Sequence, residues 1–81
     1  MIFIFLKTIK IPSNEEGDVD IMSEEHDQAS AMCEQADFAR ITMRDGTVIS
    51  AAKHNFNGGR CDCCGVNMFS NGIKFDFYKI A

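Results

Sequence analysis

Two segments in the second half of the chain alternate strictly between apolar and polar residues. In the first, the apolar positions are Ala39, Ile41 and Met43, and the polar ones are Arg40, Thr42 and Arg44. In the second, they are Ile73, Phe75 and Phe77, against Lys74, Asp76 and Tyr78. Because successive side chains of a strand point to opposite faces, this pattern predicts two strands with one buried face each.

Turn signals connect these strands to their neighbours. Asp45-Gly46 stands between the first alternating segment and "TVISAAK", residues 47–53. Asp-Gly between strand-like runs predicts a β-hairpin closed by a two-residue type I′ turn, in which both turn residues have positive φ. "SNG", residues 70–72, predicts a second hairpin that joins a strand beginning near Gly65 to the last strand.

The first segment, "IFIFLKTIKI" over residues 2–11, is apolar on both faces. One face is predicted to hold Phe3, Phe5, Ile9 and Ile11, and the other begins with Ile2, Ile4 and Leu6. A strand of this kind is usually central in its sheet or covered on both sides. Pro12 is expected to end it.

Residues 23–36, "SEEHDQASAMCEQA", predict the helix of this chain. Ser23 is the expected N-cap, and Glu24 and Glu25 lie in the first turn, where the helix dipole favours negative charge. Apolar and small residues recur at three- and four-residue steps and form one stripe: Met22, His26, Ala29, Met32, Cys33 and Ala36. We therefore expect an amphipathic helix that packs on a sheet.

These elements predict the α+β class. We expect one small domain over residues 1–81, in which one amphipathic helix packs on a mainly antiparallel sheet of four to five strands, in the order β-α-β-β-β-β. A chain of 81 residues buries only about 60–65% of its unfolded surface, so a metal ion or a partner would add useful stability. An exposed edge strand would let two copies pair as a homodimer, but the sequence does not indicate which strand lies at the edge.

The charge is unevenly distributed along the chain. The formal net charge is −4, yet residues 12–37 hold nine carboxylates and no Lys or Arg. Seven of them lie close together and are named here the acidic patch: Glu15, Glu16, Asp18, Asp20, Glu24, Glu25 and Asp27. A concentrated negative field attracts basic surfaces, although acidic loops also serve simply to keep proteins in solution.

The stretch "HNFNGGRCDCCGVN", residues 54–67, is the main candidate for metal chemistry. A zinc site there would use His54, Cys61, Cys63 and Cys64. The C-x-C-C spacing is tighter than the usual pair of C-x2-C knuckles, and adjacent cysteines tend to point apart. Cys33 is an alternative fourth ligand. The competing interpretation is a glycine-rich turn whose thiols act as small packing residues, with no cofactor.

An enzyme is not expected. The sequence contains no phosphate-binding glycine pattern, no H-E-x-x-H and no nucleophile elbow. His26 lies on the apolar helix face, which is typical of a packing residue. A cysteine-dependent enzyme with His54 beside the thiols is the more distant alternative, because no third orienting group can be identified.

Membrane and nucleic-acid association are also not expected. The apolar run that begins "MIFIFL" stops at Lys7 and has no basic residue ahead of it, so we expect neither a signal peptide nor a membrane span of about 20 residues. The basic residues are scattered without an aromatic platform between them, so no direct nucleic-acid binding is expected. The predicted location is the cytoplasm, or the host cytoplasm if a phage encodes the protein.

The sequence therefore favours a non-enzymatic protein-binding module that engages a basic surface of another protein through the acidic patch. In size and composition the chain is similar to phage or mobile-element accessory proteins that inhibit a host protein, although no specific motif carries this similarity. The alternative is a small zinc-stabilised structural domain organised by the Cys/His loop.

Overall fold

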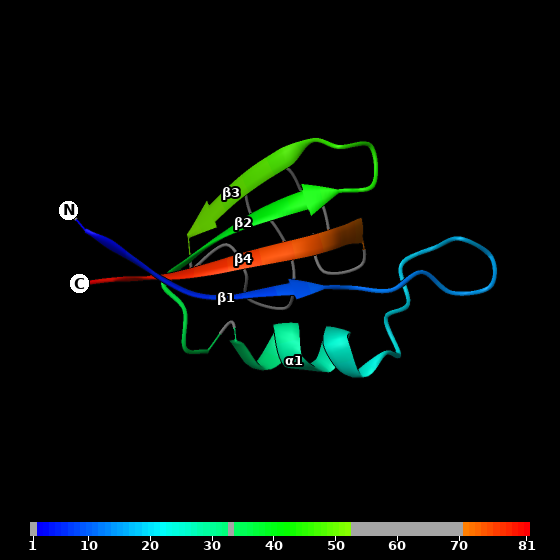
Figure 1. Cartoon of the computed structure of the whole chain (residues 1–81), viewed down its shortest axis with the longest axis horizontal. Coiled ribbons are helices and arrows are strands. Elements are labelled where there is room, and N and C mark those ends of the chain that lie inside the picture. The colour runs from blue at the N-terminus through cyan, green and yellow to red at the C-terminus, as the bar shows by residue number, and fades with distance from the viewer. Residues whose placement is uncertain (1, 33, 53–70) are drawn as a thin grey trace.

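The computed structural model describes residues 2–32, 34–52 and 71–81 (Figure 1). These residues form one helix and four strands: β1 (Phe3–Lys10), α1 (Glu24–Met32), β2 (Phe38–Met43), β3 (Val48–Ala52) and β4 (Gly72–Ile80). The α+β architecture with an antiparallel sheet agrees with the prediction. The strand expected near residues 65–69 lies outside the described residues and stays a prediction.

The sheet has the order β1-β4-β2-β3, and all three strand pairs are antiparallel. The C-terminal strand β4 therefore lies between β1 and β2. Its alternation is the one predicted, since Phe75 and Phe77 are fully buried while Lys74, Asp76 and Tyr78 are only partly covered. Figure 1 shows α1 running alongside β1.

The core lies between the helix and one face of the sheet. Its buried members are all apolar: Ile9, Ile11, Val19, Ala29, Ala36, Ala39, Ile41, Phe75 and Phe77. The rings of Phe75 and Phe77 stack with their centroids 5.9 Å apart. Ala39 lies directly opposite Phe77 in the sheet, and Ala29 of the helix is fully buried in the same cluster.

The expectation that the first strand is central in its sheet is not confirmed by the described residues. Within the described sheet, β1 is an edge strand that pairs with β4 alone. The apolar residues from Ile2, just before the strand, to Leu6 are exposed, and only Ile9 of the strand is buried. A continuous apolar run shows that a segment is suited to burial on both sides, but it does not show what covers it.

The predicted faces of β1 were wrong, because the register shifts at Leu6. Phe5 lies opposite Tyr78, while Lys7 lies opposite Phe77, the next residue of β4. Such a bulge adds one residue and reverses the alternation that follows. Phe3 and Phe5 therefore lie on the open face of the sheet, whereas Ile9 faces the core.

The helix is shorter than predicted. Ser23 is its N-cap as expected, since its hydroxyl accepts a hydrogen bond of 3.1 Å from the amide of His26. The helix ends at Met32, and Ala36 reaches the core from the turn that follows. Met22 was placed on the buried stripe but is 86% exposed, because it precedes the cap and does not share the helical spacing. Cys33 lies outside the described residues.

The Asp45-Gly46 hairpin is present, but its turn is not type I′. Gly46 has φ of 90°, and no non-glycine residue among those described has positive φ. The amide of Gly46 donates to the carbonyl of Met43, and Met43 donates to Thr47. This pattern fits a longer loop with glycine in the left-handed position. The hydroxyl of Thr47, and then its amide, lower the pKa of Asp45 at the loop tip.

Candidate functional site

The acidic patch begins in the loop between β1 and α1. In Figure 1 this loop lies at the end of the molecule opposite the two chain termini. Buried Ile11 and Val19 tie both sides of the loop to the core, and a β-bridge pairs Ser13 with Val19. Asp20 donates its amide to the carbonyl of Pro12 at 2.9 Å. The loop is therefore a closed turn that the core holds at its base.

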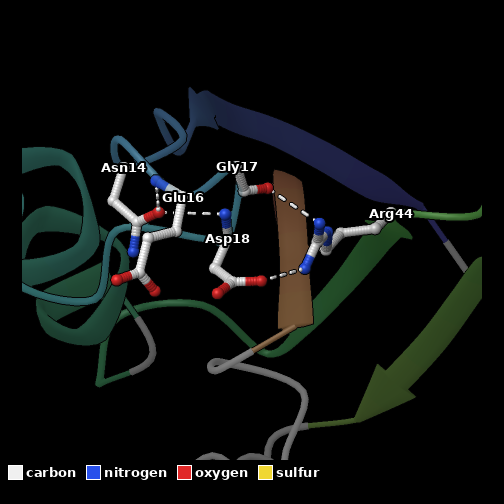
Figure 2. Close-up of polar contacts among 5 residues, drawn as sticks. All are labelled: Asn14, Glu16, Gly17, Asp18 and Arg44. Carbon is white, nitrogen blue, oxygen red and sulfur yellow. Dashed lines mark hydrogen bonds and ion pairs between the residues drawn. The ribbon is translucent and has the colours of Figure 1, made fainter.

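Asn14 fixes the tip of this loop from inside. Its side-chain oxygen accepts hydrogen bonds from the amides of Glu16 at 2.9 Å and Asp18 at 3.0 Å (Figure 2). The backbone amide of Asn14 donates to the carbonyl of Asp18, and the backbone carbonyl of Asn14 accepts from the amide of Gly17. Gly17 has φ of 84°, a conformation that other residues adopt at a cost. The backbone that carries the first carboxylates is thereby set in one conformation.

Arg44 connects the loop to the β2–β3 hairpin. One guanidinium nitrogen lies 2.8 Å from the carboxylate of Asp18, and the other donates to the carbonyl of Gly17 at 2.7 Å (Figure 2). Both side chains are half-exposed, so the ion pair itself stabilises by at most about 1 kcal/mol. Its main effect is positional, because it joins two segments that are far apart in the sequence.

The second half of the patch is the start of α1. The side-chain carboxylate of Asp20 accepts a hydrogen bond from the amide of Met22, and the backbone carbonyl of Asp20 accepts one from the Ser23 hydroxyl. These contacts direct the chain from the loop into the helix. Three further carboxylates lie in the first helical turn, namely Glu24, Glu25 and Asp27. The seven residues of the patch thus lie in the loop between β1 and α1 and in the first turn of α1.

The seven carboxylates have two different roles. Asp18 and Asp20 are used within the segment, by Arg44 and by the turn before the helix. The other five are exposed, and their side chains make no hydrogen bond or ion pair within the part of the chain that the structure describes: Glu15, Glu16, Glu24, Glu25 and Asp27. These five are available to an incoming basic group.

Sequence reasoning missed Asn14 and Arg44. Asn14 and Gly17 occupy the first and fourth positions of a four-residue turn, which favour those two residue types, so this signal was available in the sequence. Arg44 was expected to extend the exposed face of β2 beside Arg40. Instead β2 ends at Met43 and the Arg44 side chain reaches the acidic loop. No local pattern indicates a contact across 26 residues.

The open face of the sheet gathers aromatic rings that are dispersed in the sequence. Phe3 contacts Phe38, and Phe5 and Phe38 each contact Tyr78, with centroids 5.4–5.6 Å apart. Arg40 lies nearby on β2, directly opposite Asp76 of β4, whose carboxylate accepts a hydrogen bond from Thr8. The neighbouring carboxylate offsets this basic group, so we continue to expect no direct nucleic-acid binding.

The proposed zinc ligands His54, Cys61, Cys63 and Cys64 lie outside the described residues, as does the alternative ligand Cys33. Within residues 2–32, 34–52 and 71–81, no three His, Cys, Asp or Glu side chains form a group that could hold a metal ion. The zinc site therefore stays a prediction from the sequence.

A metal assay tests this prediction. If the Cys/His loop binds zinc, protein purified without chelator should show one zinc ion by native mass spectrometry, and a chelator should lower the melting temperature by several degrees. A protein without metal, whose melting temperature is the same with and without chelator, would contradict the zinc site.

No helix in the part of the chain that the structure describes is long and apolar enough to cross a membrane. Comparisons of the chain with protein-family models, with characterised proteins and with solved structures found no match. The described residues define the protein as a small α+β domain with a four-stranded antiparallel sheet and one helix.

Proposed function

We propose that this protein is a non-enzymatic protein-binding module whose acidic patch engages a basic surface of another protein. Occupying such a surface would block whatever the partner normally binds there, including nucleic-acid phosphate. This is the action of an inhibitor or accessory protein of the phage or mobile-element type. The partner is thus defined by its chemistry, as a protein with clustered Lys and Arg.

The fastening of the acidic loop is the observation that carries this proposal. A loop that only keeps a protein in solution needs no fixed shape, whereas this loop is held by Asn14, by the bridge at Val19 and by Arg44. A surface fixed before binding loses less conformational entropy on association. The fixed loop therefore favours recognition over general solvation.

The distribution of charge supports the same proposal. Five carboxylates without a partner among the described residues occur in one segment of the fold. Apart from Arg44, which pairs with Asp18, the Lys and Arg residues that the structure describes lie on the strands. Such an asymmetric field raises the rate at which a positively charged surface is encountered, and it suppresses binding to acidic proteins. Partner choice by charge requires no catalytic group.

Capture experiments test the proposal. Wild-type protein immobilised through its C-terminal end should retain basic proteins from a lysate of the organism that encodes it. Their retention should fall steeply as the salt concentration rises, because exposed charges are screened over about 10 Å at 0.1 M ionic strength. Retention of proteins that have no basic surface, or retention that is insensitive to salt, would contradict the proposal.

A further inference from the structure

The first half of β1 is an apolar strand that little of the described structure covers. Five consecutive apolar residues, from Ile2 through the start of the strand, keep more than a third of their surface exposed: Ile2 69%, Phe3 50%, Ile4 48%, Phe5 54% and Leu6 37%. They lie on both faces of the strand, so no flat surface could cover them together. A neighbouring strand could, because it flanks both faces of an edge at once.

The backbone of this segment is suited to receive such a strand. The carbonyl of Ile2 accepts a hydrogen bond from the amide of Ala81, so Ile2 is turned toward the C-terminal end of the chain. Antiparallel pairs alternate between bonded and non-bonded residues. Ile2 and Ala81 form a bonded pair, so Phe3–Ile80 and Phe5–Tyr78, one and three positions further along the ladder, are non-bonded pairs. The amide and carbonyl groups of Phe3 and Phe5 therefore point away from β4, toward the open edge.

We propose that the first half of β1 pairs with its own copy in a second molecule, antiparallel and about a two-fold axis at Ile4. In this register Ile4 faces Ile4 of the second copy, and Phe3 faces Phe5. Each Phe3–Phe5 pair joins two residues whose polar backbone groups point outward, so each can exchange two hydrogen bonds. The inference does not depend on the proposed function.

The side chains of the strand match a second copy. Residues 2–6 carry no charged side chain, and in this register each Lys7 lies beyond the paired apolar residues, so no two lysines face one another. The exposed parts of the five side chains amount to roughly 500 Å², on a scale of about 150–250 Å² for a whole aromatic side chain. A stable interface takes about 800 Å² from each partner, so pairing of these residues supplies part of that area and neighbouring residues of the two copies must supply the rest.

The charge layout is compatible with the same dimer. Figure 1 places the N-terminal end of β1 at the opposite end of the molecule from the acidic loop. Two copies joined at Ile4 therefore hold their acidic patches at the two far ends, where mutual repulsion is screened. The dimer would present one patch at each end.

Pairing of β1 with β3, the strand at the other edge of the described sheet, is the main alternative. Val48 of β3 has the same exposed fraction as Ile4, 48%. A contact between β1 of one molecule and β3 of the next joins two different surfaces and need not close, so it leads to open chains of molecules. A two-fold contact of β1 with itself closes after two copies.

The test measures molar mass by light scattering during gel filtration, over a concentration series with reductant present. The full wild-type chain should have twice the 9.0 kDa monomer mass. Ile4→Lys and Ile4→Glu should each have the monomer mass, because like charges then face one another at the axis. An equal mixture of the two variants should restore the dimer mass, and the matched edge variant Val48→Lys should remain a dimer.

Other results overturn the proposal. A wild-type monomer throughout the series would do so, as would a Val48→Lys variant that loses its dimer, or a mixture of folded Ile4→Lys and Ile4→Glu that stays monomeric. Hydrogen exchange of the wild type gives a reading that requires no variant. Protection of the Phe3 and Phe5 amides should increase with protein concentration, and protection that is the same at all concentrations would assign the edge to another segment of the chain.

Discussion

Replacing Phe77 by Ala should lower the melting temperature of the protein by about 15–30 °C. Phe77 is fully buried on the central strand, between Lys7 of β1 and Ala39 of β2. Truncating a buried Phe costs about 3–5 kcal/mol. At 0.05–0.15 kcal/mol per residue, the whole domain has only about 4–12 kcal/mol of stability, and each kcal/mol shifts the midpoint by about 4–8 °C in a domain of this size.

Thermal unfolding followed by circular dichroism measures this effect. The control is Val48→Ala, which truncates an exposed apolar residue of the same sheet and should change the free energy of unfolding by about 0.5 kcal/mol or less. If Phe77→Ala melted within a few degrees of the wild type, Phe77 could not lie at the centre of the core.

The strands that bury one face were predictable from the sequence, and the reason is physical. Burial on one side demands a period of two, so Ala39 and Ile41 on β2 and Phe75 and Phe77 on β4 identify themselves by alternation. The faces of the first strand were predicted wrongly because a bulge at Leu6 leaves no mark in an apolar run. Edge position depends on partners that are distant in the sequence, which periodicity cannot report.

The site was predictable in its composition but not in its construction. Charge counting finds every carboxylate of the acidic patch, because they are contiguous in the chain. It does not distinguish Asp18, which is paired with Arg44, from Glu15 and Glu16, which are not paired with any described residue. That distinction depends on a contact between the loop and a hairpin, and it decides which residues a binding experiment should change.

Neutralising three free carboxylates should reduce partner capture about tenfold or more while the fold is retained. The variant combines Glu15→Gln, Glu16→Gln and Glu25→Gln, and it keeps Asp18 and Asp20 because both hold the loop in place. An exposed ion pair contributes about 0.5 kcal/mol, and three such losses amount to about 1.5 kcal/mol, slightly more than the 1.4 kcal/mol that corresponds to a tenfold change in affinity. The free energy of unfolding should change little, because all three side chains are exposed.

A charge-matched variant separates the patch from the charge of the whole molecule. Gln35→Lys, Ser50→Lys and Ala81→Lys add three positive charges at exposed positions outside the patch. Three charges removed or three added both change the net charge from −4 to −1. If overall charge alone governed capture, the two variants would lose it equally.

The most direct measurement is therefore quantitative mass spectrometry of the basic proteins retained from one host lysate by the wild type and by these two variants. We predict that the lysine variant retains them nearly as well as the wild type, whereas the glutamine variant loses them. Equal retention by all three proteins, or equal loss in both variants, would contradict recognition by a fixed acidic surface.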